Sequence, residues 1–207
     1  MGIDMAQAET ISFNDQPVGS VPAGFSVALT GGGKAPKWEV QKAPAGESGQ
    51  VVVETSQDTT NYRFPLLVHD TITASDLDLS VQLRAIGGSV DQAGGLVWRY
   101  RDADNYYIVR ANALEGNVVL YKVENGRRID LPLKGKGKTY GAKAPVPGNT
   151  WNALAVKVRG DTFTVSFNDA WLYEVEDKTF PDAGKIGLWT KADSVTMFNQ
   201  LVIAVIK

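Results

Sequence analysis

The sequence predicts an all-β protein, an antiparallel sandwich or barrel, and three observations lead to this class. Short apolar or alternating segments recur along the whole chain, separated by turns rich in Gly, Pro, Asn and Asp. No segment shows a convincing apolar pattern at helical period. The 207 residues are 43% hydrophobic, which is enough for one full core. We expect one domain over residues 9–207, preceded by a segment, residues 1–8, that is disordered or foreign to the natural protein.

Each strand is expected where side chains alternate, because successive residues of a strand face opposite sides of a sheet. The alternation is clearest in 76–84, 154–159 and 163–168, where one face is apolar and the other polar, as in a sheet with one buried side. In chain order, the expected strands are 9–13, 25–29, 38–41, 50–55, 64–68, 77–86, 95–100, 106–112, 118–124, 151–159, 162–168, 171–175, 185–190 and 195–206.

Tight turns join several of these strands into hairpins. The most informative hairpin is 94–110, where two alternating strands surround an Asp-Ala-Asp-Asn turn at 102–105. Turns at 124–127, 159–162 and 168–171 have the same chemistry. A longer basic segment rich in Gly and Pro, 134–147, is expected to be functional or disordered, because long loops in a compact domain usually are.

Composition excludes several classes of partner and site. The net charge of -2, from 21 Lys+Arg and 23 Asp+Glu, gives no cationic field for a nucleic acid. The longest apolar run, 201–206, is far shorter than the roughly 20 residues that cross a bilayer, so no membrane insertion is expected. The absence of Cys excludes disulfides and thiolate sites. The segment 5–9, with Ala6 and Ala8, resembles a signal-peptide cleavage region, so we expect a periplasmic or secreted location, with a plain cytoplasmic start as the alternative.

With these strands in view, the chain resembles the concanavalin-A-like and laminin-G-like jelly rolls of bacterial exported proteins. More narrowly, it resembles the domain named for 3-keto-disaccharide hydrolases. The segments that carry the resemblance are Phe13 with 22–25, the 94–110 hairpin, 119–123, 151–154 with Phe163, 174–180 and 183–195. The resemblance implies an antiparallel two-sheet jelly-roll sandwich, a fold that hosts lectins, glucanases, lyases, binding modules and structural domains.

The same resemblance raises the question of a structural Ca²⁺. In related jelly rolls, an acidic residue after a Phe of the last strand helps to hold Ca²⁺ with an acidic residue of the first strand. The local candidates are Glu9, Asp15 and Asn199. Because Ca²⁺ prefers charged oxygen ligands, the neutral Asn199-Gln200 pair argues against the ion, and no other cofactor is expected.

A ligand-binding face is expected opposite the apolar side of the central strands. Rings that pack on sugar C–H faces, together with amide and guanidinium groups that pair with hydroxyls, would bind a carbohydrate there. Seven residues form this expected face: Gln82, Arg84, Arg99, Tyr106, Arg110, Trp189 and Lys191. We expect Arg99 and Arg110 to meet at the centre of the concave sheet, held by an internal acid or by a ligand. The alternative is structural pairing with Asp102 and Asp104.

Catalytic chemistry has few candidates. Glu174 and Glu176 lie two residues apart on one strand, the arrangement that a retaining glycosidase could use, but the Glu-x-Asp-x-x-Glu pattern of jelly-roll glucanases is absent. We prefer the alternative that both residues belong to the solvated face of an ordinary strand, because exposed carboxylates often serve only solubility. His69, the single histidine, is expected to be a strand-end residue with local hydrogen bonds.

The sequence therefore favours a non-catalytic carbohydrate-binding or recognition domain of an exported bacterial protein. One alternative is a hydrolase that acts on glycosides or 3-keto-disaccharides, which requires a working carboxylate pair. The other is an interaction or scaffold domain of the cell envelope. The oligomeric state is not set by any of these patterns.

Overall fold

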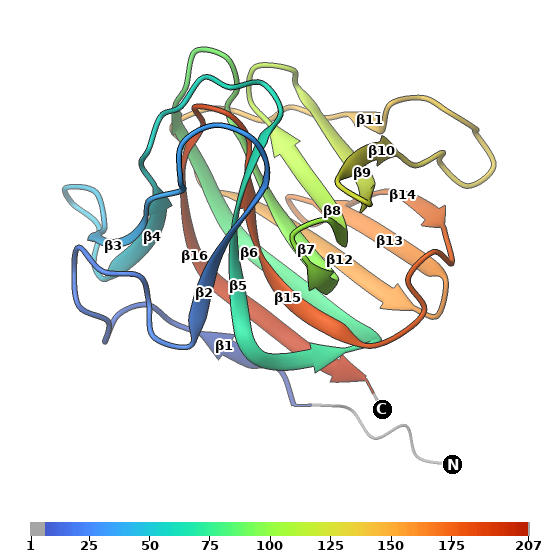
Figure 1. The fold of residues 1–207 in the computed structure, drawn as a ribbon, viewed down its shortest axis with the longest axis horizontal. Helices are drawn as coiled ribbons and strands as arrows, with labels where there is room; N and C mark the ends of the chain where they lie inside the picture. Colours follow the sequence, from blue (N-terminus) through green and yellow to red (C-terminus); the bar gives the residue numbers. More distant parts are fainter. Residues whose placement is uncertain (1–6, 207) are drawn as a thin grey trace.

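A computed structural model describes residues 7–206, and these residues form two antiparallel sheets packed face to face (Figure 1). One sheet, called sheet B, lies in front of the other, called sheet A, in this view. No helix occurs in the described residues, so none could span a membrane. The all-β prediction is confirmed. Of the expected N-terminal segment, residues 1–6 lie outside the described part of the chain.

Sheet A has the order β14-β13-β12-β6-β16-β4-β3, with β1 paired to β16. Its strands are β1 (Glu9–Ile11), β3 (Trp38–Lys42), β4 (Gln50–Glu54), β6 (Asp76–Gly87), β12 (Asn152–Arg159), β13 (Thr162–Phe167), β14 (Ala170–Glu176) and β16 (Val195–Ile206). The central pair is β6 and β16, which are far apart in the sequence and lie antiparallel. Sheet membership therefore depends on pairings that local sequence does not specify.

Sheet B has the order β10-β9-β8-β7-β15-β5-β2, with β11 paired to β9. Its strands are β2 (Phe25–Gly31), β5 (Arg63–Ala74), β7 (Ala93–Asp102), β8 (Asn105–Asn112), β9 (Asn117–Glu124), β10 (Arg127–Asp130), β11 (Ala142–Lys143) and β15 (Gly184–Thr190). Every strand expected from the sequence is present. The short strands β10 and β11 are additional, and they belong to the segment around the long basic loop.

The core lies between the sheets and is built from alternate residues of each strand. Leu77, Leu79, Val81 and Leu83 of β6 all point into it, with exposures of 1% or less. Trp98 of β7 stacks on Tyr107 of β8, with ring centroids 5.6 Å apart. The inward faces predicted from alternation are therefore confirmed for β6, β7 and β8.

The outer face of sheet B carries a second apolar layer, which the sequence did not lead us to expect. This layer contains Phe64, Leu66, Val97, Tyr106, Ile108, Tyr121 and Trp189. The guanidinium of Arg128, from β10, lies 4.8 Å from the Phe64 ring centroid and 4.5 Å from that of Tyr121. Such cation–π contacts cover the rings and keep water from them. Sheet B is thus buried on both faces, whereas residues 7–206 leave the outer face of sheet A open.

Candidate functional site

The seven residues expected to form one ligand-binding face do not lie together. Gln82 and Arg84 lie on β6 in sheet A, whereas the other five lie on or directly after strands of sheet B. The outward faces of two packed sheets point in opposite directions. The prediction of a single face with all seven side chains is therefore wrong, because β6 pairs with β12 and β16 rather than with β7.

Arg99 points toward the sandwich interior instead of the outer face. The β7–β8 register shifts between Trp98 and Asp102, and Arg99 has a left-handed φ of 46°. Such a bulge reverses the alternation of side chains. The Arg99 guanidinium is 1% exposed and donates to three backbone carbonyls, at distances of 2.7 to 3.0 Å. They belong to Ser75, Gly160 and Phe180.

Arg110 lies on the other face of sheet B, so the two arginines do not meet. Its guanidinium donates to Glu115 at 2.8 Å and to the phenol oxygens of Tyr121 and Tyr140 at 3.1 and 3.3 Å. Burial opposes ionisation of Glu115, but the neighbouring Arg110 and Asn117 hold its pKa below its usual value. Both arginines thus have internal partners, and these are not the Asp102 and Asp104 expected as the alternative.

The remaining three sheet B candidates are also occupied by internal contacts. Tyr106 is fully buried, its phenol oxygen lies 2.7 Å from Thr30 Oγ1, and burial raises its pKa. Trp189 is fully buried and stacks on Phe64 at 5.3 Å. Lys191 Nζ pairs with Asp91 at 2.5 Å. These side chains therefore stabilise the sheet rather than face solvent.

The open outer face of sheet A contains three hollows that share residues and form one groove. Their volumes are about 260, 270 and 500 Å³. The first two share Ser80, Ala155 and Val202, and the last two share Gln82 and Gln200. The residues along the middle of this sheet A groove are Asp78, Ser80, Gln82, Ala153, Ala155, Ser166, Gln200 and Val202, and further residues line its two ends.

Two features of the sequence create this groove. Outward positions of β6, β12 and β13 carry small side chains, since Ser80, Ala155 and Ser166 stand where larger residues would fill the space. On β16 the register with β6 shifts between Asn199 and Val202, and Gln200 has a φ of 48°. A bulge bends a strand locally and re-aims its side chains. The groove therefore has a narrow floor of small residues beside an irregular strand.

Two tryptophans flank the sheet A groove. Trp151 lines its larger end, where its Nε1 donates to Glu47 Oε2 at 2.8 Å. Glu47 also pairs with Arg84 at 2.8 Å, so the indole is held by a fixed carboxylate. Trp171 is 62% exposed and pairs in register with Ser166, which places it on the groove side of sheet A. Sequence reasoning missed both residues, because exposure of a tryptophan cannot be read from alternation.

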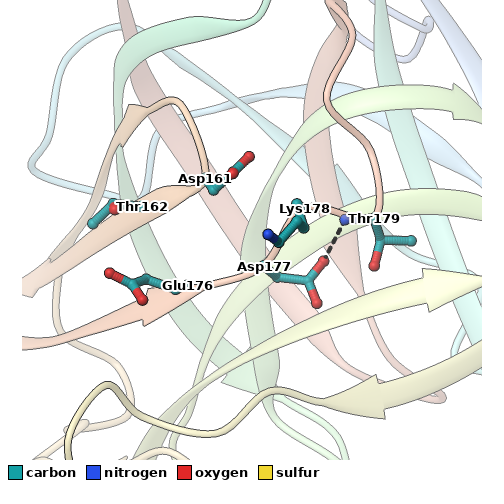
Figure 2. A pocket seen from close by; sticks show the side chains of 6 residues that line it. All are labelled: Asp161, Thr162, Glu176, Asp177, Lys178 and Thr179. Atoms are coloured by element: carbon teal, nitrogen blue, oxygen red, sulfur yellow. Dashed lines mark hydrogen bonds between the residues drawn. The ribbon is translucent and has the colours of Figure 1, made fainter.

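A separate acidic pocket of about 690 Å³ lies at the ends of β13 and β14 (Figure 2). Its lining residues are Asp161, Thr162, Glu176, Asp177, Lys178 and Thr179. Figure 2 shows Glu176 and Asp177 pointing to different sides, as expected for consecutive residues. Burial opposes ionisation of Asp177, but hydrogen bonds from Thr179 and Tyr107 hold its pKa below the usual value. Asp177 is thereby engaged in packing β14 against sheet B.

The carboxylate pair expected as the catalytic alternative shares one lysine cation. Lys134 Nζ lies 2.7 Å from Glu176 and 3.6 Å from Glu174. Glu174 also accepts a hydrogen bond from Thr164 at 3.2 Å. These contacts match the ordinary strand-face interpretation of the pair. The lysine comes from the long basic loop, so that loop is attached to the edge of sheet A.

The remaining candidate residues from the sequence are His69 and the calcium candidates. His69 Nδ1 accepts from the backbone N–H of Ile72 at 3.2 Å, the local bonding expected for a strand-end residue. Glu9 pairs in register with Ile203, whereas Asn199 lies nearer the start of β16 and pairs with Gln82. Within residues 7–206, no group of three or more acidic or histidine side chains is placed to hold a metal. A structural Ca²⁺ at Glu9, Asp15 and Asn199 stays a possibility raised by the sequence alone.

Comparisons with known proteins identify the fold. No family model and no curated protein matches the chain. The carbohydrate binding module CBM66 from Bacillus subtilis has a TM-score of 0.65 at 21% identity, over 87% of this chain and 95% of that one. The cellulose induced protein Cip1 has a TM-score of 0.63 at 7% identity, over 87% and 90%.

A third similar structure is domain 4 of AbnA, a GH43 extracellular arabinanase from Geobacillus stearothermophilus, in complex with arabinotriose. Its TM-score is 0.58 at 15% identity, over 98% of this chain and 94% of that domain. At such low identities these likenesses show the fold alone. The chain is a concanavalin-A-like jelly-roll sandwich, as the sequence predicted.

Proposed function

We propose that this domain binds carbohydrate without catalysing a reaction on it, and that the glycan lies in the sheet A groove. The observation that carries the proposal is the groove itself, an open channel lined by Trp151, with the exposed Trp171 paired in register with the lining residue Ser166. Binding sites of this kind combine a concave surface with aromatic rings and a few polar groups. The groove supplies all three on a rigid sheet.

The chemistry of a sugar matches these groups. The C–H faces of a pyranose or furanose ring are apolar and pack on an indole, while the hydroxyls around the edge need donors and acceptors. The amides of Gln82 and Gln200 and the hydroxyls of Ser80 and Ser166 each offer both. Because Trp151 is already hydrogen-bonded to Glu47, little side-chain entropy is lost when a ligand binds.

Names of similar structures support the proposal, although each name belongs to its own protein. One similar structure is a carbohydrate binding module, and another is an arabinanase domain in complex with arabinotriose. The hydrolase alternative is less well supported, because Glu174 and Glu176 share the cation of Lys134. An exported location and a bacterial source remain predictions from the sequence.

The proposal is tested by screening the intact protein on a glycan array and by calorimetry with the glycans that bind. Trp151→Ala and Trp171→Ala should each weaken binding by about tenfold or more, equivalent to about 1.4 kcal/mol. Leu114→Ala is the matched control, since Leu114 is 53% exposed and lies outside sheet A. Thermal melts should show that all three variants fold.

Two results would contradict the proposal. One is the absence of binding across neutral and acidic glycans. The other is binding that neither tryptophan variant weakens beyond the Leu114→Ala control, which would place the site elsewhere on the molecule.

A further inference from the structure

We infer that the sheet A groove takes an internal stretch of an extended, uncharged polysaccharide chain, rather than a chain end or an acidic polymer. This inference rests on the proposed function and adds the class of ligand. It depends on three observations about the groove: its continuity, the nature of its ends, and the pairing of the charges around it.

The groove is long relative to a single sugar. The three hollows overlap through shared residues and follow β6 from Asp78 to Gln82. At about 3.3 Å per residue, these four steps alone span about 13 Å. The hollow at Trp151 and Glu47 continues beyond Gln82. A ligand that contacts the whole length must therefore contain several linked sugars.

Both ends of the groove are formed by exposed residues. Ala8 and Lys157 stand at one end, and Glu47 and Ser48 stand at the other. Recognition of a chain terminus needs a closed pocket whose buried groups pair with the terminal hydroxyls. Among residues 7–206, the lining at both ends is exposed, so a polymer can enter and leave the groove without an end being bound.

The charged side chains around the groove balance one another. Arg84 pairs with Glu47 at 2.8 Å, and the guanidinium of Arg159 pairs with Asp78 at 2.8 Å. The remaining charged lining residues are Lys157 and Asp169, one of each sign. The groove therefore offers no excess positive charge to attract a polyuronate. A neutral polysaccharide carries no charge, so it needs no charged partner in the groove.

The test compares glycans of different length and charge with the intact protein. Affinity electrophoresis in gels containing arabinan, xylan, mixed-linkage β-glucan or polygalacturonate identifies the preferred polymer. Calorimetry then measures oligosaccharides of increasing length from that polymer, before and after borohydride reduction of their ends. We expect a neutral polymer to be preferred, affinity to rise at least tenfold from monosaccharide to hexasaccharide, and end reduction to change nothing.

A blocking variant tests the position of the chain. Ser80→Tyr places a ring where two hollows overlap and should weaken hexasaccharide binding at least tenfold. Thr73→Tyr, at an exposed position of β5 in sheet B, is the control and should bind normally. If Ser80→Tyr does not fold, Ala153→Tyr tests the same groove from β12, and the length series is independent of both variants.

The outcomes separate the two proposals. A preference for polygalacturonate that weakens with salt, equal affinity for mono- and hexasaccharides, or loss of binding on end reduction overturns this inference but leaves carbohydrate binding intact. Normal hexasaccharide binding by a folded blocking variant also overturns it. Failure to bind any of these polymers or the array glycans overturns the proposed function itself.

Discussion

Replacement of Arg99 by Met should destabilise the fold severely, although the sequence alone suggested a ligand-binding role for this residue. Met keeps the apolar stem and removes the guanidinium, whose three donated hydrogen bonds join the β5–β6 turn, the β12–β13 turn and Phe180. Hydrogen bonds of charged groups contribute about 1.5–3 kcal/mol each and are not additive. Ser75 and Gly160 are exposed, so water can replace the donor there, whereas Phe180 is 3% exposed.

The free energy of unfolding should therefore fall by about 3–4 kcal/mol, within the range for breaking a buried charged contact. For a chain of this size, that corresponds to a Tm about 6–16 °C lower. The assay is urea denaturation followed by tryptophan fluorescence. Arg101→Met is the matched control on the same strand, because Arg101 is 40% exposed and pairs with an exposed Asp182. It should lose about 1 kcal/mol or less. Equal losses in the two variants would refute the structural role assigned to Arg99.

Three further predictions concern stability. Gly95→Ala should cost about 1–3 kcal/mol in urea denaturation, because an added Cβ would lie 2.5 Å from the Val109 carbonyl oxygen, whereas Gly32→Ala has open space and should be neutral. Burial lowers the pKa of His69. The neutral imidazole of the folded state therefore contributes its full share of the free energy of unfolding above the unfolded-state pKa of about 6.5. This contribution is lost as the pH falls below that value. His69→Gln should flatten the pH dependence of the urea midpoint between pH 7.5 and 5, and an unchanged slope would contradict this. Asp193→Asn should cost about 1–3 kcal/mol, since its carboxylate accepts from three consecutive backbone N–H groups, and unchanged hydrogen exchange at 89–91 would contradict that role.

The sequence by itself determined the strands and the inward faces of most of them. Alternation in β6 placed Leu77 to Leu83 in the core, and the Asp-Ala-Asp-Asn turn located the β7–β8 hairpin correctly. These features are local, since side chains of a strand alternate whatever the strand pairs with. Local hydrogen bonding likewise explains why His69 was interpreted correctly.

Tertiary structure decided which residues share a surface. Gln82 and Arg110 both face outward, but β6 and β8 belong to different sheets, and strand partners are chosen by contacts distant in the sequence. One bulge moved Arg99 to the interior, because a shift of one residue exchanges the two faces of a strand. Arg128 from β10 covers part of the outer layer of sheet B, and no local sequence pattern predicts this contact. The open groove of sheet A, with Trp151 and Trp171 beside it, could be found only once the sheets were assembled, since exposure depends on what the rest of the chain leaves uncovered.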